Sequence, residues 1–294
     1  MGFNLNLGDI YAILTAICWS SAVILFDLSS RRLSSLQVNI LKNIIGVFGF
    51  LITLQFIESS FQKCSIDDFV LLIISGLLGV AIGDLMFLAS LRRLGSGLTA
   101  IVGTSYSPAV FLFSLLMFQE AISIQSYFGG ILVILGIIVG TFKTSHFGKK
   151  DILKGVFFGI GAQALTAYSV LIVRPMMDSY SIIFIALVRF STGFILSSFF
   201  LWISEGYNSF INTIKLGIRN PYLVSGAFLG TYLSVIFWLL GFKYTLAGRA
   251  AIYNQLSTIL IILMAAIFLK EPMTKRKWIA VSLAIFGALI VSSI

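Results

Sequence analysis

Residues 79–97, GVAIGDLMFLASLRRLGSG, and residues 230–248, GTYLSVIFWLLGFKYTLAG, are two copies of one pattern, and this repetition decides the fold. Adding 151 to a residue number in the first stretch gives the matching position in the second. The matches within and beyond these stretches are Gly79 with Gly230, Phe87 with Trp238, Arg92 with Lys243, Gly97 with Gly248, Ala100 with Ala251, Glu120 with Glu271 and Gly136 with Gly287. A repeat at a fixed separation indicates an internal duplication.

The beginning of each half matches at a smaller separation. Asp9-Ile10 matches Asp151-Ile152, and Lys42 matches Arg189. A small insertion in the later half, between its second and third apolar segments, explains the change of separation. We therefore expect two homologous units, residues 1–146 and residues 147–294.

The composition places both units in a membrane. Hydrophobic residues make up 59% of the 294 residues and charged residues only 11%, with a mean hydropathy of +1.04. A soluble domain is about 45–50% apolar and about 25% charged. These values exclude a disordered chain, a nucleic-acid-binding protein, a collagen-like fibre and a disulfide scaffold.

Apolar segments recur along the chain at the length of a membrane helix, which is roughly 20 residues. The composition and these segments predict an all-α membrane protein with ten transmembrane helices. The expected spans are 8–28, 35–57, 68–91, 97–118, 124–142, 152–173, 180–204, 221–242, 249–269 and 276–294.

Each half then holds five spans, and an odd number forces the second half to start on the opposite side of the bilayer. The expected architecture is two inverted five-helix repeats, an arrangement that transporters use for alternating access. One half can adopt the conformation that the other has just left, so that a central site faces each side in turn. The architecture thus favours a secondary carrier.

Three ionisable residues lie deep inside predicted spans: Lys42, Asp84 and Arg189. A charge at bilayer depth costs about 2.5–3.5 kcal/mol on insertion scales and therefore indicates a functional or paired group. Asp84 can take up a proton, because burial disfavours a charged carboxylate, and it is the candidate proton-coupling residue. The alternative is a structural ion pair with Lys42 or Arg189. Because Lys42 and Arg189 match across the repeat, they share a structural or an anion-facing role.

Other polar or amphipathic side chains sit deep in the spans and are candidates for the substrate site. Consecutive residues on a helix point about 100° apart, so Tyr253, Asn254 and Gln255 cannot all face lipid without cost. The alternative for each is a hydrogen bond between helices, worth about 0.6 kcal/mol on average. The full set of candidates is Trp19, Ser20, Tyr106, Gln163, Tyr168, Arg189, Trp238, Tyr253, Asn254 and Gln255.

Six short motifs, in order along both halves, resemble those of one transporter superfamily. They are Cys18-Trp19-Ser20, Ala89-Ser90-Leu91-Arg92-Arg93, Ser107-Pro108, Gln119-Glu120, Val188-Arg189-Phe190 and Lys270-Glu271. The chain resembles the drug/metabolite transporter superfamily, in its ten-span EamA-like branch, over nearly its whole length. The resemblance implies a carrier that exports amino acids or related compounds. The sequence departs from the family pattern in span nine, where Thr258-Ile259 stands in place of a second serine-proline pair.

Two other function classes remain as alternatives, a channel and an intramembrane enzyme. No histidine lies in a predicted span, which removes a serine-histidine dyad and an H-E-x-x-H zinc site. An aspartyl protease needs two carboxylates at one site, and Asp27 is a poor partner for Asp84. We expect no catalytic residue, no metal and no cofactor. The expected partners are a small-molecule substrate and the lipid bilayer, with no nucleic acid, for a monomer or homodimer in a prokaryotic inner membrane.

Sidedness stays open at this point. An even number of spans places both termini on the same side of the membrane. Most of the lysines and arginines in the loops then lie on the opposite side. The positive-inside rule then places the termini outside, whereas the family resemblance places them inside.

Overall fold

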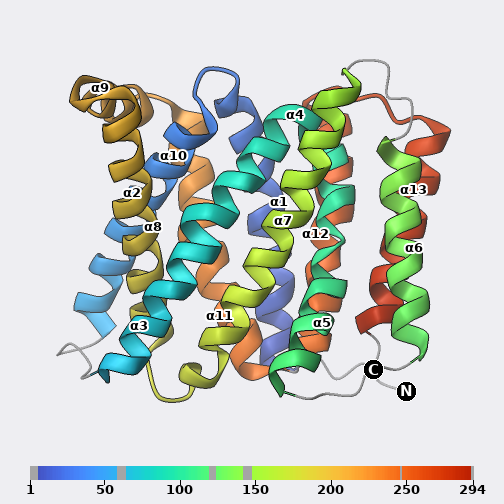
Figure 1. Cartoon of the computed structure of the whole chain (residues 1–294), viewed down its shortest axis with the longest axis horizontal. Coiled ribbons are helices and arrows are strands. Elements are labelled where there is room, and N and C mark those ends of the chain that lie inside the picture. The colour runs from blue at the N-terminus through green and yellow to red at the C-terminus, as the bar shows by residue number, and fades with distance from the viewer. Residues whose placement is uncertain (1–5, 58–63, 119–123, 142–147, 246, 293–294) are drawn as a thin grey trace.

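A computed structural model describes residues 6–57, 64–118, 124–141, 148–245 and 247–292. In these ranges the chain forms long helices that stand side by side, joined by short connections (Figure 1). The first half contains α1 (Leu7–Ser30), α2 (Ser35–Ile57), α3 (Ile66–Ser75), η1 (Gly76–Gly83), α4 (Asp84–Gly103), α5 (Tyr106–Phe118) and α6 (Ile124–Thr141). The second contains α7 (Lys149–Val173), η2 (Arg174–Met177), α8 (Ile182–Glu205), α9 (Tyr207–Ile218), α10 (Pro221–Ala227), η3 (Phe228–Leu233), α11 (Ser234–Tyr244), α12 (Ala247–Phe268) and α13 (Lys275–Ser292).

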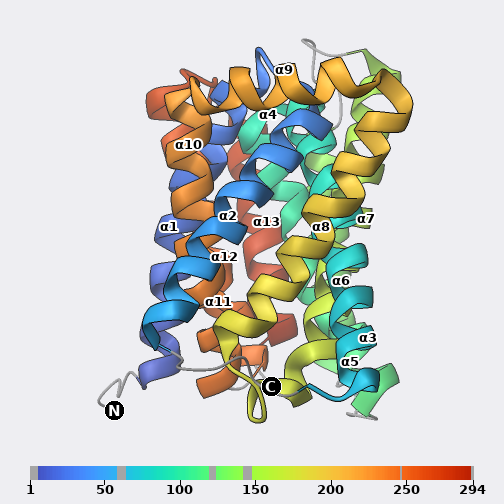
Figure 2. The ribbon, with the colours of Figure 1, turned by 90° about the vertical axis from the view of Figure 1, so that its left-hand side faces the viewer.

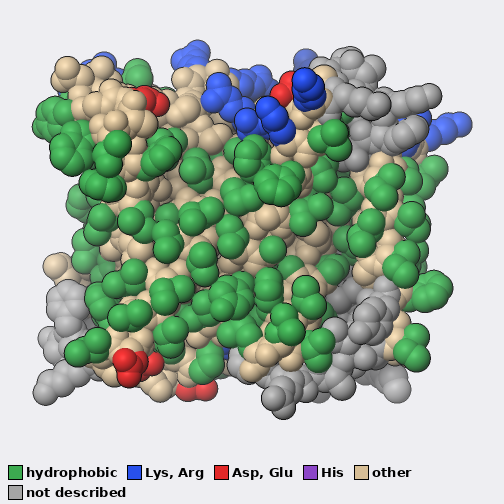
Figure 3. All heavy atoms as spheres, viewed as in Figure 1, with side chains coloured by type: hydrophobic (Ala, Val, Ile, Leu, Met, Phe, Trp, Pro, Cys, Tyr) green, Lys and Arg blue, Asp and Glu red, His purple; other side chains and the backbone are tan. Residues whose placement is uncertain are grey.

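Within the described ranges, six helical stretches are long and apolar enough to cross a membrane. Three shorter apolar helices accompany them, and a band of apolar side chains covers the middle of the molecule (Figure 3). The protein is therefore an integral, multi-pass membrane protein. The six stretches are Leu7–Ser30, Ser35–Phe56, Ile66–Gly103, Lys150–Met177, Ile182–Glu205 and Pro221–Tyr244.

The two halves begin at opposite edges of the molecule. In Figure 1, α1 starts near the lower edge and runs upward, whereas α7 starts near the upper edge and runs downward. The helix α1 begins, and α13 (Lys275–Ser292) ends, towards the lower edge. The predicted boundary between the halves, at 146/147, lies outside the described residues.

Each half contains a π-helical turn at the matching place in the repeat. The turn η1 contains Gly79, and η3 contains its repeat mate Gly230. A Cβ on Gly79 would collide with the Ser169 side chain, and one on Gly230 would lie 2.5 Å from the Cβ of Ala22. The glycines thus let a neighbouring helix approach closely, as small residues do in membrane bundles. Wide π turns occur often at functional sites.

The expected fourth span, 97–118, is broken in the structure. The chain changes direction at Gly95, just before this span, and α4 then ends at Gly103 in the turn Thr104–Ser105, before α5 begins. Pro108 explains the second break, since its ring clashes with the carbonyl four residues earlier, which belongs to Thr104. The span-nine counterpart lacks a proline, and α12 is continuous.

The insertion expected in the second half is the helix α9. Residues 58–65 connect α2 to α3, whereas the longer segment 206–220 connects α8 to α10 and includes α9. Figure 2 shows α9 lying across the upper ends of the other helices. It is fastened to α2 by a hydrogen bond of 3.2 Å from Gln37 to Thr213.

The helices α6 and α13 pack against each other at one end of the bundle (Figure 1). A Cβ on Gly136 would lie 2.8 Å from the Cβ of Ala284, and one on Gly287 would lie 2.5 Å from the carbonyl oxygen of Gly129. These close approaches leave no room for larger side chains. The remaining long helices surround the centre of the molecule.

Candidate functional site

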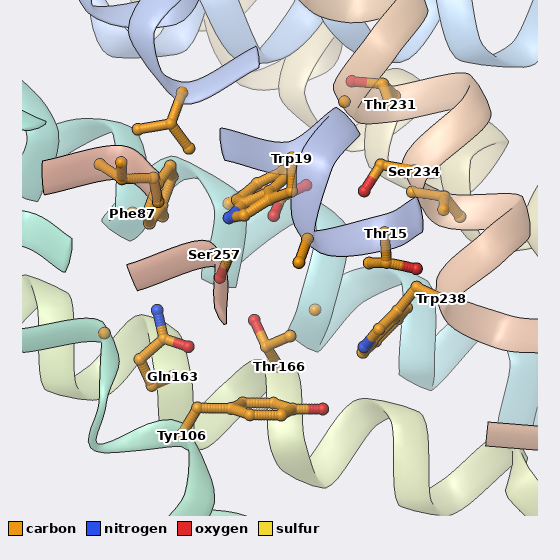
Figure 4. Close-up of a pocket in the computed structure, with 18 of the residues that line it drawn as sticks. Thr15, Trp19, Phe87, Tyr106, Gln163, Thr166, Thr231, Ser234, Trp238 and Ser257 are labelled. Carbon is orange, nitrogen blue, oxygen red and sulfur yellow. The ribbon is translucent and has the colours of Figure 1, made fainter. Parts of the chain in front are cut away.

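A cavity of about 180 Å³ lies between the two halves. One water needs at least about 10–15 Å³ of such space, so the cavity has room for a small metabolite. Figure 4 shows Trp19, Trp238, Tyr106 and Gln163 around it. Its lining consists of Thr15, Ala16, Trp19, Val23, Lys42, Gly79, Val80, Asp84, Phe87, Thr99, Ala100, Gly103, Tyr106, Gln163, Thr166, Arg189, Phe190, Gly230, Thr231, Ser234, Val235, Trp238, Gln255, Ser257, Thr258 and Ile261.

The lining follows the duplication. Residues that match between the two halves of the sequence face the same cavity, in pairs. The cavity therefore lies where the two repeats meet, which is the position of substrate sites in repeat-built transporters. The pairs are Lys42 with Arg189, Gly79 with Gly230, Val80 with Thr231, Asp84 with Val235, Phe87 with Trp238 and Tyr106 with Ser257.

Lys42 and Asp84 form an ion pair at the cavity wall, with 2.5 Å between Nζ and Oδ2. The Lys42 ammonium also donates a hydrogen bond of 2.9 Å to Asn43 Oδ1 and lies 5.4 Å from the centre of the Phe190 ring. The Lys42 side chain is 6% exposed, and that of Asp84 is 21% exposed. The ion-pair interpretation of Asp84 therefore has a geometric basis, and its carboxylate is the more accessible partner.

Arg189 reaches the cavity from α8 and is 3% exposed. Its Nη2 donates a hydrogen bond of 3.1 Å to Ser169 Oγ, and its guanidinium lies 5.7 Å from the centre of the Trp238 ring. The Nε and Nη1 groups have no hydrogen-bond partner among the described protein atoms. Gly76 and Gly79 permit this placement, because side chains at either position would meet Arg189.

Aromatic rings form much of the remaining wall. Trp19 packs on Phe87 with 5.4 Å between ring centres, and Trp238 packs edge-on against Phe242 at 5.5 Å. Tyr106 is 7% exposed, and its hydroxyl has no hydrogen-bond partner within the described part of the chain. Figure 4 shows the Tyr106 ring facing the space below Trp19 and Trp238. The wall suits an apolar or aromatic group.

Amides and hydroxyls supply neutral polar groups beside these rings. Gln255 donates a hydrogen bond of 2.7 Å from Nε2 to Ser107 Oγ, which joins α12 of the second half to α5 of the first. Gln163 and Thr166 of α7 lie next to Tyr106 in Figure 4. The site therefore combines one ion pair, one additional cation, several aromatic rings and a set of neutral hydrogen-bonding groups.

The structure brings most of the sequence-predicted site residues together in this cavity. Three others are not among the lining residues: Ser20, Tyr168 and Tyr253. The Ser20 hydroxyl donates to the Ile17 carbonyl at 3.0 Å, and Tyr168 packs on the Phe113 ring at 5.2 Å. The side chain of Asn254 is not among those that the structure describes. The predicted residues on the lining are Trp19, Asp84, Tyr106, Gln163, Arg189, Trp238 and Gln255.

Sequence reasoning did not single out the small hydroxyl residues of the lining. A lone serine or threonine in an apolar span gives no pattern, because its hydroxyl can bond to the carbonyl one turn earlier. The duplication could have identified one of them. Ser257 matches Tyr106 in the repeat, and Tyr106 was already a candidate for the substrate site. The residues concerned are Thr15, Thr99, Thr166, Thr231, Ser234, Ser257 and Thr258.

Within the described residues, no group of three or more histidine, cysteine, aspartate or glutamate side chains is arranged to hold a metal ion. The motif Gln119-Glu120 lies outside the described residues.

Comparisons with known proteins agree with this architecture. An uncharacterized transporter of Archaeoglobus fulgidus is 25% identical over 263 residues, which covers 89% of each chain. A protein of known crystal structure superposes with a TM-score of 0.69 at 14% identity, over 96% of this chain and 95% of the other, and so shares the fold. The model of the EamA-like transporter family matches twice, over residues 6–142 and 153–293. The chain therefore belongs to the EamA-like transporter family.

Proposed function

We propose that the protein is a secondary-active carrier built from ten transmembrane helices in two inverted halves. The observation that carries this proposal is the central cavity, which repeat-related residues of both halves line in pairs. The opposite courses of α1 and α7 support the inversion (Figure 1). The proposed spans are α1, α2, α3 to Gly95 of α4, Ser96 to the end of α5, α6, α7, α8, α10 to α11, α12 and α13.

In this proposal the two halves exchange conformations, and the cavity opens to one side of the membrane and then to the other. Such motion needs helices that can slide or bend where they line the site. The π turns η1 and η3 and the break at Thr104–Ser105 all lie beside the cavity and provide these places. The mechanism is alternating access.

The cargo class follows from the lining, which joins aromatic rings to amides, hydroxyls and charges. Small polar or amphipathic metabolites, such as amino acids, match this mixture. Export is the direction that the family resemblance implies. We place the protein in the prokaryotic plasma membrane as a monomer or homodimer.

Counterflow in proteoliposomes tests the carrier proposal. Vesicles are loaded in turn with amino acids and with aromatic carboxylates, and uptake of the same labelled compound is measured. A carrier shows saturable uptake that the internal compound accelerates. Thr166→Trp, which fills the cavity, should abolish the acceleration, whereas Ser204→Trp, at an exposed position of α8, should preserve it. Uptake that never saturates and ignores the internal compound would instead identify a channel.

We also propose Asp84 as the site of proton coupling. The charged groups that face it are Lys42 of α2 and Arg189 of α8. A proton on Asp84 removes the charge that holds Lys42 and loosens the contact between α2 and α4. Asp84→Asn should therefore abolish transport driven by a pH gradient and spare counterflow. Survival of gradient-driven uptake in this variant excludes Asp84 as the coupling group.

A further inference from the structure

We propose that Arg189 docks a carboxylate, and that the carried substrate is a small monoanion with an apolar or aromatic body. This inference rests on the proposed function as a carrier and names the chemistry of its cargo. It starts from the charges and the unpaired hydrogen-bond donors of the cavity wall.

The charge of the lining favours a single negative charge on the ligand. Lys42, Asp84 and Arg189 are its charged side chains among the described residues. Lys42 and Asp84 neutralise each other through their ion pair, so one positive charge is left, on Arg189. A monoanion balances this charge in a region of low dielectric constant. A dianionic phosphate ester would leave an excess negative charge, and a cation would add a second positive one.

The hydrogen-bonding capacity of Arg189 points to the same ligand. A guanidinium carries five N–H donors in a planar fork, and Arg189 uses one of its nitrogens on Ser169. Its Nε and Nη1 have no partner among the described protein atoms, although the residue is 97% buried. Buried donors in native proteins are nearly always paired. A carboxylate accepts two parallel hydrogen bonds along one edge of the fork, from Nη2 together with Nε or Nη1. Ser169 takes only one of the two Nη2 hydrogens, so such an edge remains available.

Tyr106 adds a second donor on the same side of the cavity. Its hydroxyl is buried and lies beside Arg189 and Trp238. The Trp238 indole can only donate, so the Tyr106 hydroxyl proton stays available to a ligand. The Trp19, Phe87 and Trp238 rings surround the remaining space. A ligand with its carboxylate on Arg189 therefore places its carbon skeleton among aromatic side chains.

A matched pair of ligands tests the inference on the protein itself. 3-Phenylpropionate carries the proposed groups, and 3-phenylpropanamide has the same shape without the charge. The chain has four tryptophans, and two of them, Trp202 and Trp278, are exposed. The double variant Trp202→Phe/Trp278→Phe leaves Trp19 and Trp238 as fluorescent reporters of the cavity. The acid should bind at least about tenfold more tightly than the amide. Equal affinities would overturn the proposal.

Substitutions at Arg189 then assign the effect to this residue. In Arg189→Gln the preference for the acid over the amide should disappear, whereas Arg189→Lys should retain part of it because the charge stays. The control is Arg93→Gln, since Arg93 lies off the cavity, donates to the Ala89 carbonyl and stacks on Phe158. An acid preference that survives in a folded Arg189→Gln protein would also overturn the proposal.

Binding and transport separate this inference from the carrier proposal. If the acid binds through Arg189 but none of the tested compounds shows counterflow, the carboxylate site stands and the carrier proposal fails. If amines or amides are exchanged and the acid does not bind, the carrier proposal stands and the carboxylate site fails.

Discussion

Lys42 and Asp84 show how a charged pair can be kept inside an apolar bundle. Their contact of 2.5 Å, with Asn43 as a second acceptor, satisfies the Lys42 ammonium at 6% exposure. The Asp84 side chain is more exposed than that of Lys42. Substituting one partner should therefore change the free energy of unfolding by a different amount than substituting the other. Removing the partner of a buried charge is more costly than removing the whole pair.

This difference yields a stability prediction. Asp84→Leu leaves Lys42 buried and unpaired and should destabilise the protein by about 3 kcal/mol. Lys42→Met should cost less, because the remaining carboxylate reaches the cavity. The double variant Lys42→Met/Asp84→Leu should recover most of the loss. Thermal unfolding in one detergent compares the four proteins, and additive losses in the double variant would contradict the prediction.

At the scale of single helices, glycine decides where the chain bends. Gly95 has φ 74° and ψ 171° inside α4, a region that side chains other than glycine adopt only at a cost. A Cβ there would also approach Glu271 Oε1 at 3.1 Å. Glu271 in turn accepts a hydrogen bond from the Gly97 amide and pairs with Lys277 at 2.6 Å. The bend thus joins the first half to the second.

Gly95→Ala should therefore lower the free energy of unfolding by about 1–3 kcal/mol. The matched control is Gly130→Ala, because Gly130 lies within α6 and a Cβ there would meet nothing within 4 Å. Helical alanine is more favourable than glycine by roughly 0.5–1 kcal/mol, so the control should be neutral or stabilised. Thermal unfolding measures both, and a Gly95→Ala protein as stable as the control would show that the bend tolerates a side chain.

At the scale of the whole molecule, the basic side chains gather at one edge. Figure 3 shows lysines and arginines at the upper edge, whereas acidic side chains are visible at both edges. The first helix α1 begins and the last helix α13 ends towards the lower edge (Figure 1). Loops rich in lysine and arginine stay in the cytoplasm, with about 1 kcal/mol per basic residue gained near anionic lipids.

The charge distribution predicts that both termini face the outside of the cell. Reporter fusions provide the measurement: alkaline phosphatase, active only outside, and green fluorescent protein, fluorescent only inside, each attached to either end. Both ends should give active phosphatase and no fluorescence. Fluorescence at both ends would show that the family resemblance, and not the loop charge, predicts the orientation. Different results at the two ends would contradict an even number of spans.

The sequence was sufficient for the features that depend on composition and repetition. Its apolar segments predicted the helices, the change of repeat separation predicted the insertion that is α9, and deep charges at Lys42, Asp84 and Arg189 predicted groups that now meet at one cavity. The break at Thr104–Ser105 was not predicted, although Pro108 was visible, because a proline inside a span can bend a helix or interrupt it.

The sequence by itself determined a duplicated, helical membrane protein, because hydropathy and repetition are properties of the chain that do not depend on packing. Only the tertiary structure decided which polar side chains share the cavity. Trp19 lines it and Ser20 does not, and Thr166 lines it and Tyr168 does not. A step of one residue turns a side chain about 100° around its helix, and close packing at positions such as Gly79 and Gly230 fixes how each helix is rotated. Those contacts join residues far apart in the sequence, so no local pattern records them.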